Sequence, residues 1–321
     1  MKGYLFFFLL LASPTLQAQT ETNIGSDPQD TSEKSRKTVI TSLAINKSSG
    51  RYHAIIISVH QYEDPAITAL PGTENDANDF FSLLTSKYNF HSADVTRMFN
   101  PTRADIIDAI EEKRKTLSID DNLLIFYAGH GYWDENLKMG YWLPTDAKID
   151  SKSNWVTNND LTIYLSAIQS NHILLISDAC FSGGIFKTRS IGDMDQGTTR
   201  LYKLKSRKAI TSGNLKEVPD NSIFMKFFLK ELELNENAFL TPDQLFAKIR
   251  PNILNNSSTE PLYGVIHNTG DEGGEFVFYS PEAQSNLEID DEKELINLIV
   301  KQERKEVRSV INLENKILKA K

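Results

Sequence analysis

The chain has one cysteine, Cys180, among its 321 residues, so it can form no internal disulfide. An unpaired thiol is either a small buried hydrophobe or a reactive group. The chain also lacks an excess of positive charge, because its formal net charge is −8 at pH 7. That balance argues against binding to nucleic acid, which requires a concentrated basic patch. No Walker-type or dinucleotide-binding glycine loop is present.

The histidines other than His130 lack a Cys or His partner at the spacing that zinc ligands require, so we expect no zinc site. These residues are His53, His60, His91, His172 and His267. We expect that no cofactor is required. Asp193 and Asp195 leave a calcium site as an alternative, although a solvated loop is the favoured interpretation of these two acids.

Long apolar runs are also missing outside the N-terminus. Residues 1–18 have the pattern of a signal peptide, with Lys2 before a short apolar stretch at 4–12 and small residues up to Ala18. The stretch is too short for a stable bilayer span, so we expect export to the periplasm or beyond and no membrane span after cleavage. A membrane-tethering helix is the alternative. Residues 19–50 are rich in small polar residues and are expected to form a mobile leader.

Residues 51–280 alternate short apolar runs with segments of helical periodicity, which predicts βαβ units. We therefore predict a three-layer α/β/α sandwich around a mostly parallel, six-stranded sheet. Strands are expected at 54–59, 94–99, 123–127, 172–177, 208–212 and 275–279, the last closing the sheet, and helices at 75–87, 102–116, 159–169, 222–234 and 241–249. Thr102 and Thr241 are expected N-caps, with Pro242 at the first helical position.

Residues 281–321 are highly charged and carry apolar residues at helical spacing, which predicts an amphipathic helix. The helix either packs on its own domain or binds a partner, including a second copy, through residues 287–321. The sequence leaves both alternatives open.

Two of the apolar runs end abruptly in glycine and small polar residues. The run at 123–127 leads to His130, and the run at 173–176 leads to Cys180. Continuous apolar runs of this length are typical of strands buried on both faces of a parallel sheet. The carboxyl ends of such strands are where open α/β sheets bind their ligands. A lone Cys and a His at those positions are typical of a thiol nucleophile and its base.

The two strings, Tyr-Ala-Gly-His-Gly at 127–131 and Asp-Ala-Cys-Phe-Ser-Gly at 178–183, resemble the His and Cys motifs of caspase-like peptidases. They are most similar to the metacaspase and bacterial orthocaspase branch. Further matching strings lie at 72–77, 141–147 and 273–278, in the order found in the family, so the resemblance covers about residues 51–280. The family's fold agrees with the sandwich predicted from periodicity.

The resemblance implies a role for each matching residue. Cys180 is the nucleophile, and His130 is the general base and then the acid that protonates the leaving amine. The backbone N–H groups of Gly131 and Cys180 resemble the family's oxyanion hole. No third side chain is needed, because a backbone carbonyl orients the His in this family.

Specificity is expected to depend on two carboxylates. True caspases have an arginine just before the Gly-Thr that matches Gly72 and Thr73, but the segment here is Leu70-Pro71-Gly72, without an arginine. The metacaspase-like acids Asp76 and Asp178 are present and would attract Arg or Lys before the cut. The alternatives are an acid in the first turn of a helix for Asp76 and a turn-forming residue for Asp178.

The leading hypothesis is therefore an exported cysteine endopeptidase acting on protein or peptide substrates after Arg or Lys. The alternatives are a catalytically silent caspase-like binding module and a hydrolase of non-peptide carbonyls. The loop at 187–207 is rich in basic residues and is expected to be exposed and open to self-cleavage. Its basic residues are Lys187, Arg189, Arg200, Lys203, Lys205 and Arg207.

Overall fold

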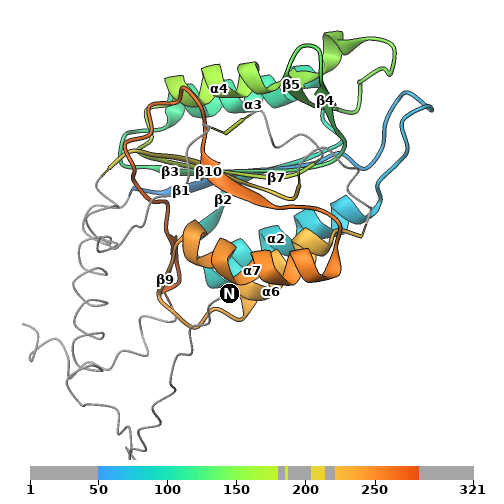
Figure 1. Ribbon diagram of the computed structural model, residues 1–321. Helices are drawn as coiled ribbons and strands as arrows, with labels where there is room; N and C mark the ends of the chain where they lie inside the picture. The colour runs from blue at the N-terminus through green and yellow to red at the C-terminus, as the bar shows by residue number, and fades with distance from the viewer. Residues whose placement is uncertain (1–49, 180–184, 187–203, 214–220, 282–321) are drawn as a thin grey trace, which may run out of the picture.

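The computed structural model describes residues 50–179, 185–186, 204–213 and 221–281 (Figure 1). Its main sheet has six strands in the order β10-β8-β7-β3-β1-β2. Their bounds are β1 Tyr52–Ser58, β2 Phe90–Phe99, β3 Asn122–Ala128, β7 His172–Asp178, β8 Ser206–Thr211 and β10 Leu262–Val265. All neighbours pair in parallel except β10, which is antiparallel to β8. The mostly parallel, six-stranded sheet confirms the predicted fold class.

Helices cover both faces of this sheet (Figure 1). One face carries α3 (Arg103–Thr116) and α4 (Asn158–Ala167). The other carries α2 (Gly72–Lys87), α6 (Ile223–Glu233) and α7 (Pro242–Asn256). The two helical layers confirm the predicted α/β/α sandwich. Among the residues described, no helix is long and apolar enough to cross a bilayer.

The central strands are apolar at successive positions because both of their faces are buried. Ile56 and Phe126 pack in the cluster that contains Phe80 of α2, whereas Ile55 packs in the cluster that contains Ile106 of α3. Successive side chains of a strand point to opposite faces, so a strand between two helical layers needs a continuous apolar run. This requirement explains why the runs predicted these strands.

The starts of α3, α4 and α7 are set by side-chain caps. The hydroxyls of Thr102 and Thr241 accept hydrogen bonds from the backbone N–H groups of Asp105 and Gln244, which confirms both predicted N-caps. Thr157 caps α4 in the same way. Each such cap stabilises its helix by about 1 kcal/mol.

One predicted strand of the main sheet was wrong. Instead of closing that sheet, the segment at 275–279 contributes only β11 (Phe278–Tyr279), which pairs with β9 (Phe239–Leu240) in a separate two-stranded sheet. Its phenylalanines are buried in the core under α2 and α6 instead. A glycine is needed just before them, because a Cβ at Gly274 would lie 2.0 Å from the carbonyl oxygen of Leu204. The true edge strand, β10, is short and half-buried and has no continuous apolar run.

A second sheet that the sequence did not predict follows the His motif. It consists of β4 (Gly131–Asp134), β5 (Met139–Trp142) and β6 (Val156–Thr157), all antiparallel. Figure 1 shows β4 and β5 at one end of the main sheet, on the side of α3. This small sheet begins next to His130 and so forms one wall of the candidate site.

Candidate active site

The carboxyl edge of the main sheet brings the His motif and the Cys motif together. Ser58 pairs with Ala128 across β1 and β3, and Ala128 pairs with Asp178 across β3 and β7. Just beyond this row, the backbone N–H of Gly129 donates to the carbonyl oxygen of Asp178 at 3.4 Å. The residues that precede His130 and Cys180 in the two motifs are therefore neighbours in space.

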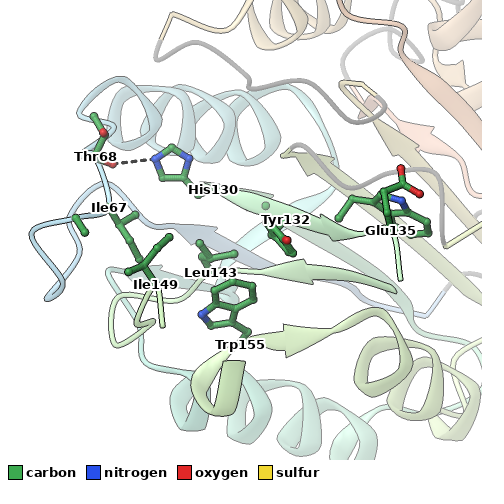
Figure 2. A pocket seen from close by; sticks show the side chains of 11 residues that line it. Ile67, Thr68, His130, Tyr132, Glu135, Leu143, Ile149 and Trp155 are labelled. Atoms are coloured by element: carbon green, nitrogen blue, oxygen red, sulfur yellow. Dashed lines mark hydrogen bonds between the residues drawn. The ribbon is translucent and has the colours of Figure 1, made fainter. Parts of the chain in front are cut away.

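His130 is held at both its ring and its backbone. Its Nε2 lies 2.8 Å from the carbonyl oxygen of Thr68, a contact drawn in Figure 2. Its backbone N–H donates to the hydroxyl of Tyr62 at 2.8 Å, and the Tyr62 ring lies 5.3 Å from the imidazole. Its carbonyl oxygen accepts from the Tyr127 hydroxyl at 2.7 Å and from the Leu143 N–H at 3.1 Å. These contacts fix the direction of the imidazole.

The contact with Thr68 also fixes the tautomer of His130. A carbonyl oxygen can only accept a hydrogen bond, so Nε2 must carry a proton in this arrangement. The lone pair of the neutral ring is then on Nδ1, which is the nitrogen able to take up a proton. The contact therefore leaves Nδ1 as the ring nitrogen with a free lone pair in the neutral ring.

The loop that carries Thr68 is itself held in place. The side-chain oxygen of Asn100 accepts from the backbone N–H groups of His60 and Gln61, both at 2.9 Å. Further along the loop, a carboxylate oxygen of Asp64 accepts from the N–H of Ile149 at 2.9 Å. The resemblance implied that a backbone carbonyl orients the His, and the structure assigns that carbonyl to residue 68. Sequence reasoning missed Thr68 and Tyr62 because the Thr68 contact uses no side-chain atom, and a lone tyrosine in a loop has no distinctive pattern.

The glycine before His130 is required by close packing. A Cβ at Gly129 would lie 2.8 Å from the hydroxyl oxygen of Tyr127. That hydroxyl cannot move away easily. The Tyr127 ring stacks on Trp142 with centroids 4.2 Å apart, and the hydroxyl hydrogen-bonds to the carbonyl oxygens of His130 and Leu143. Gly129 is therefore required by packing, in addition to being part of the motif.

Asp178 ends β7 as a buried carboxyl group that is only 4% exposed. Burial raises its pKa, and the nearby hydroxyls of Ser222 and Ser212 offset this rise in part. Among the residues described, its Oδ1 atom makes no hydrogen bond of normal geometry, and neither does the Oγ of Ser212. A buried carboxyl group in this state gains strongly from a cation that reaches it.

Asp76 lies on α2, whose start is bound to the same edge of the sheet. The Thr73 hydroxyl of α2 lies 3.1 Å from the hydroxyl of Ser58 at the end of β1. The helix begins at Gly72, three residues before its predicted start, so its first-turn acid is Glu74 and Asp76 lies further in. The favourable effect of the helix dipole fades within the first turn, which weakens the alternative role for Asp76.

Several sequence predictions fall on residues outside the described ranges. These are Cys180, the basic residues Lys187, Arg189, Arg200 and Lys203, the acids Asp193 and Asp195, the N-terminal segments at 1–18 and 19–49, and the C-terminal residues from 282 onward. Gly131 is described as the first residue of β4. Its role in an oxyanion hole stays a prediction.

The basic loop ends earlier than the sequence indicated. Arg207 was expected in an exposed loop, but it lies in β8 and is 0% exposed. Its guanidinium donates to four backbone carbonyls, those of Ile168, Ser170, Asn171 and Ser206. This burial corrects the prediction for Arg207. Lys205 lies just before β8 and is partly exposed, and its carbonyl oxygen accepts from Glu272 and Gly274.

A cavity of about 430 Å³ opens beside His130. It is lined by residues 66–68, 130–133 and 135, and by Leu143, Ile149 and Trp155 (Figure 2). Within the described parts of the chain, no three His, Cys, Asp or Glu side chains are grouped closely enough to hold a metal ion.

The fold and the His-bearing edge define an α/β protein with a candidate hydrolytic site at the carboxyl ends of β3 and β7. The family model described as the caspase domain matches residues 51–257 of the chain. This range is more than half of the sequence, so the chain belongs to the caspase-domain family of cysteine peptidases.

Individual relatives match over a shorter range. Over 100 residues, the chain is 31% identical to metacaspase-1 from two strains of Saccharomyces cerevisiae and 26% identical to metacaspase-1 from Kluyveromyces lactis. Each match spans 29% of this chain and 23% of the relative. A solved structure of a protein from Geobacter sulfurreducens is similar with a TM-score of 0.47 and 18% identity, over 72% of this chain and 95% of that one.

Proposed function

We propose that the chain is a cysteine endopeptidase that uses a dyad of Cys180 and His130. The observation that supports this most directly is the parallel pairing of Ala128 with Asp178. His130 and Cys180 each follow their member of this pair by two residues. Neighbouring strands lie about 4.8 Å apart, and two residues extend at most about 7 Å, which supports a pairing of the thiol with the imidazole.

In the proposed reaction, Nδ1 of His130 takes the proton of the Cys180 thiol. The thiolate attacks the carbonyl carbon of the scissile bond, and backbone N–H groups of Gly131 and Cys180 stabilise the oxyanion. The C–N bond then breaks, His130 gives its proton to the leaving amine, and a thioester remains on Cys180. A water molecule that loses a proton to His130 attacks the thioester, which releases the acid and restores the thiol.

We further propose that the residue before the cut is Arg or Lys. The support is the buried carboxyl group of Asp178, whose pKa is raised mainly by burial. A guanidinium that reached this carboxylate would compensate its burial and add charge-assisted hydrogen bonds. Asp76, on the helix bound to the same edge, is the second candidate for this pocket.

Alkylation and cleavage together test the dyad. An arginyl fluoromethyl ketone should label Cys180 in the wild type far faster than it labels a free peptide cysteine, and His130→Ala should remove this advantage. Cys180→Ala and His130→Ala should each lower peptide cleavage by more than about 100-fold, because dyad members act as a unit. Labelling no faster than that of a free cysteine, with no cleavage, would favour the silent binding module.

Substitution of the acids tests the specificity. Asp178→Ala and Asp76→Ala should lower kcat/KM for Arg and Lys substrates, with the larger loss at Asp178 because it is the more deeply buried of the two. Asp79→Ala is the matched control, since Asp79 is an exposed acid on the same helix. A wild-type preference for Asp before the cut would contradict the two-carboxylate pocket.

We also propose that the enzyme is exported and cuts its own basic loop at 187–205. Purified wild type should then yield two fragments split in this interval, whereas Cys180→Ala should stay whole.

Residues 287–321 are proposed to bind a partner or a second copy. Loss of a defined oligomer on their deletion, measured by light scattering, would support that role.

A further inference from the structure

Apart from His130 and Gly131, the residues that line the cavity beside His130 have no role in the proposed dyad, oxyanion hole or acidic pocket. We propose that the cavity binds the side chain of the substrate residue that follows the cut, and that it selects a large apolar or aromatic side chain there. This inference rests on the peptidase function proposed above and adds a second determinant of specificity. The cavity volume of about 430 Å³ lies within the range of small-ligand sites and is ample for one large side chain.

The position of the cavity relative to the sheet supports its assignment to the residue on the leaving-amine side of the cut. In the strand order, β3 lies between β7 and β1. Asp178, the candidate partner of the residue before the cut, ends β7, whereas the cavity is built from the loop after β1 and the hairpin after β3. Along the strand order, the position after β3 that carries His130 therefore lies between Asp178 and the loop after β1. Because His130 protonates the leaving amine, the chain carried by that amine must extend on its side.

The lining of the cavity favours an apolar occupant. Figure 2 shows Ile67, Leu143, Ile149 and Trp155 grouped on one side of His130. Ile149 is 52% exposed and Tyr132 is 43% exposed, so both present apolar surface to solvent at the cavity. Exposed apolar side chains gathered around a hollow mark a binding site more often than isolated ones do.

Glu135, the one acid among the described residues that line the cavity, does not favour a cation. Glu135 forms an ion pair with Lys138 at 2.8 Å, which neutralises this part of the rim. The buried Trp155 packs edge-on against the exposed Tyr132, with ring centroids 5.3 Å apart, so the two rings form one aromatic part of the lining. Apolar surface forms the larger part of the cavity lining, so apolar contact is the main interaction that the cavity can offer.

Two quenched peptides that differ only in the residue after a single Arg test the proposal. With Phe in that position, kcat/KM should exceed the value with Gly by roughly tenfold, which is the scale of discrimination by an apolar pocket. Ile149→Ser should shrink this ratio to about threefold or less. Ile163→Ser is the matched control, because Ile163 is 64% exposed on α4 and does not line the cavity, and it should keep the wild-type ratio.

A binding measurement makes the test independent of turnover. Two of the three tryptophans, Trp133 and Trp155, line the cavity, so occupancy should change the intrinsic fluorescence. Phenylalanyl-glycinamide should bind the wild type more tightly than glycyl-glycinamide, and Ile149→Ser should remove the difference. Equal binding of the two amides would overturn the proposal.

Different results would contradict the cavity assignment and the proposed peptidase function. Equal cleavage of the Phe and Gly peptides, or an equal change of their ratio in Ile149→Ser and Ile163→Ser, would overturn the assignment of the cavity and leave the peptidase intact. No cleavage of either peptide, with no labelling of Cys180, would overturn the proposed function and with it the leaving-side assignment.

Discussion

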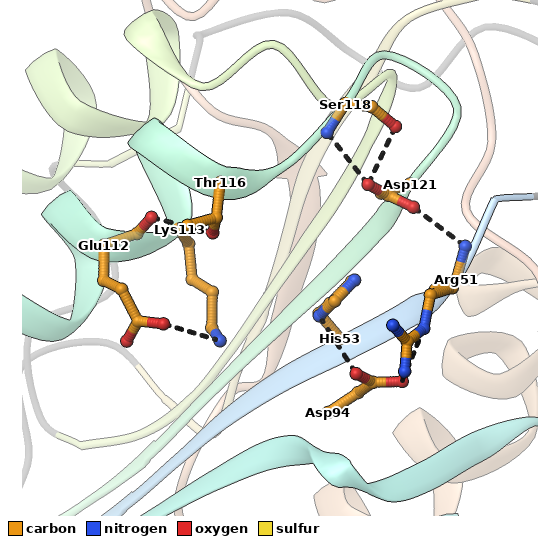
Figure 3. Close-up of polar contacts among 8 residues, drawn as sticks. All are labelled: Arg51, His53, Asp94, Glu112, Lys113, Thr116, Ser118 and Asp121. Carbon is orange, nitrogen blue, oxygen red and sulfur yellow. Dashed lines mark hydrogen bonds and ion pairs between the residues drawn. The ribbon is translucent and has the colours of Figure 1, made fainter.

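The main sheet has an amino edge, where its parallel strands begin, and a carboxyl edge, where they end. The pKa values of the carboxyl groups at these two edges are shifted in opposite directions. At the amino edge, Asp121 accepts hydrogen bonds from the backbone N–H and the hydroxyl of Ser118, each at 2.8 Å, and from the N–H of Arg51 at 2.9 Å (Figure 3). Burial would raise its pKa, but these hydrogen bonds outweigh burial and lower it. At the carboxyl edge, burial raises the pKa of Asp178, and its Oδ1 has no normal hydrogen bond within the described residues.

The carboxylate of Asp94, also at the amino edge, is compensated by its neighbours, as Asp121 is. Figure 3 shows Arg51, which directly precedes β1, and His53 of β1 on either side of Asp94 of β2. The Arg51 guanidinium lies 2.8 Å from this carboxylate, and burial lowers the pKa of His53, an effect that Asp94 partly offsets. The difference between the edges indicates that the amino edge serves stability, whereas the carboxyl edge keeps a buried carboxyl group with incomplete hydrogen bonding, as binding sites often do.

The largest expected effect is on stability, from Arg207→Met. Arg207 is fully buried near the amino edge, and its loss would leave four backbone carbonyls without this donor. We expect a loss of about 3 kcal/mol in the free energy of unfolding, measured with urea, and no change in kcat per folded molecule. Arg250→Met, an exposed arginine on α7, is the control and should be nearly neutral. A large loss of kcat with unchanged stability would break the comparison.

The next largest effect is the change in stability when Asp is replaced by Asn, and it has opposite signs at the two edges. The pKa of Asp178 is raised in the fold, so the folded state binds more protons than the unfolded state above the ordinary Asp pKa of 3.8, and Asp178 lowers stability as pH rises. Asp178→Asn should therefore stabilise the protein by about 1–3 kcal/mol at pH 7, the scale of one uncompensated buried polar group, and its advantage should vanish below pH 3.8.

The same substitution at the amino edge should destabilise. The pKa of Asp121 is lowered in the fold, so its contribution is present above 3.8 and is lost as pH falls through the folded-state value. Asp121→Asn should cost less than about 1 kcal/mol at pH 7, because solvent screens this partly exposed group. Melting temperatures of both variants between pH 3 and pH 8 check the signs, and parallel curves for the two would refute the contrast.

The smallest effect is expected for Arg51→Ala. The Arg51 side chain is 63% exposed, so its ion pair with Asp94 should contribute less than about 1 kcal/mol. The loss should shrink further in 1 M salt, where such pairs are screened. A larger loss that salt does not change would show that the arginine acts through packing and not through charge.

Some features could be predicted from local sequence alone. The parallel core followed from continuous apolar runs, because strands between two helical layers must be apolar on both faces. The caps at Thr102 and Thr241 followed from short-range hydrogen bonding, which needs only residues a few positions apart. The placement of His130 beyond β3 followed from the run that ends there.

Other features depend on contacts between distant segments. The segment at 275–279 has a strand-like pattern, but its phenylalanines pack beneath the helices, because that is where the core has room for them. The edge strand β10 is set by pairing with β8, and a short, half-buried segment has no periodicity that would reveal it. The burial of Arg207 likewise depends on carbonyls from the segment that precedes β7.

By itself, the sequence determined the layered fold, the caspase-like motifs and the choice of Asp178 as a candidate specificity residue. Each of these depends on the type and spacing of residues close together in the chain. Only the tertiary structure decided which atoms surround His130. Its proton on Nε2 is set by the carbonyl of Thr68, its backbone is held by Tyr62, and the apolar cavity beside it is assembled from the loop after β1 and the hairpin after β3. These groups come from separate loops, and a backbone carbonyl is common to every residue, so only folding selects the one that orients the imidazole.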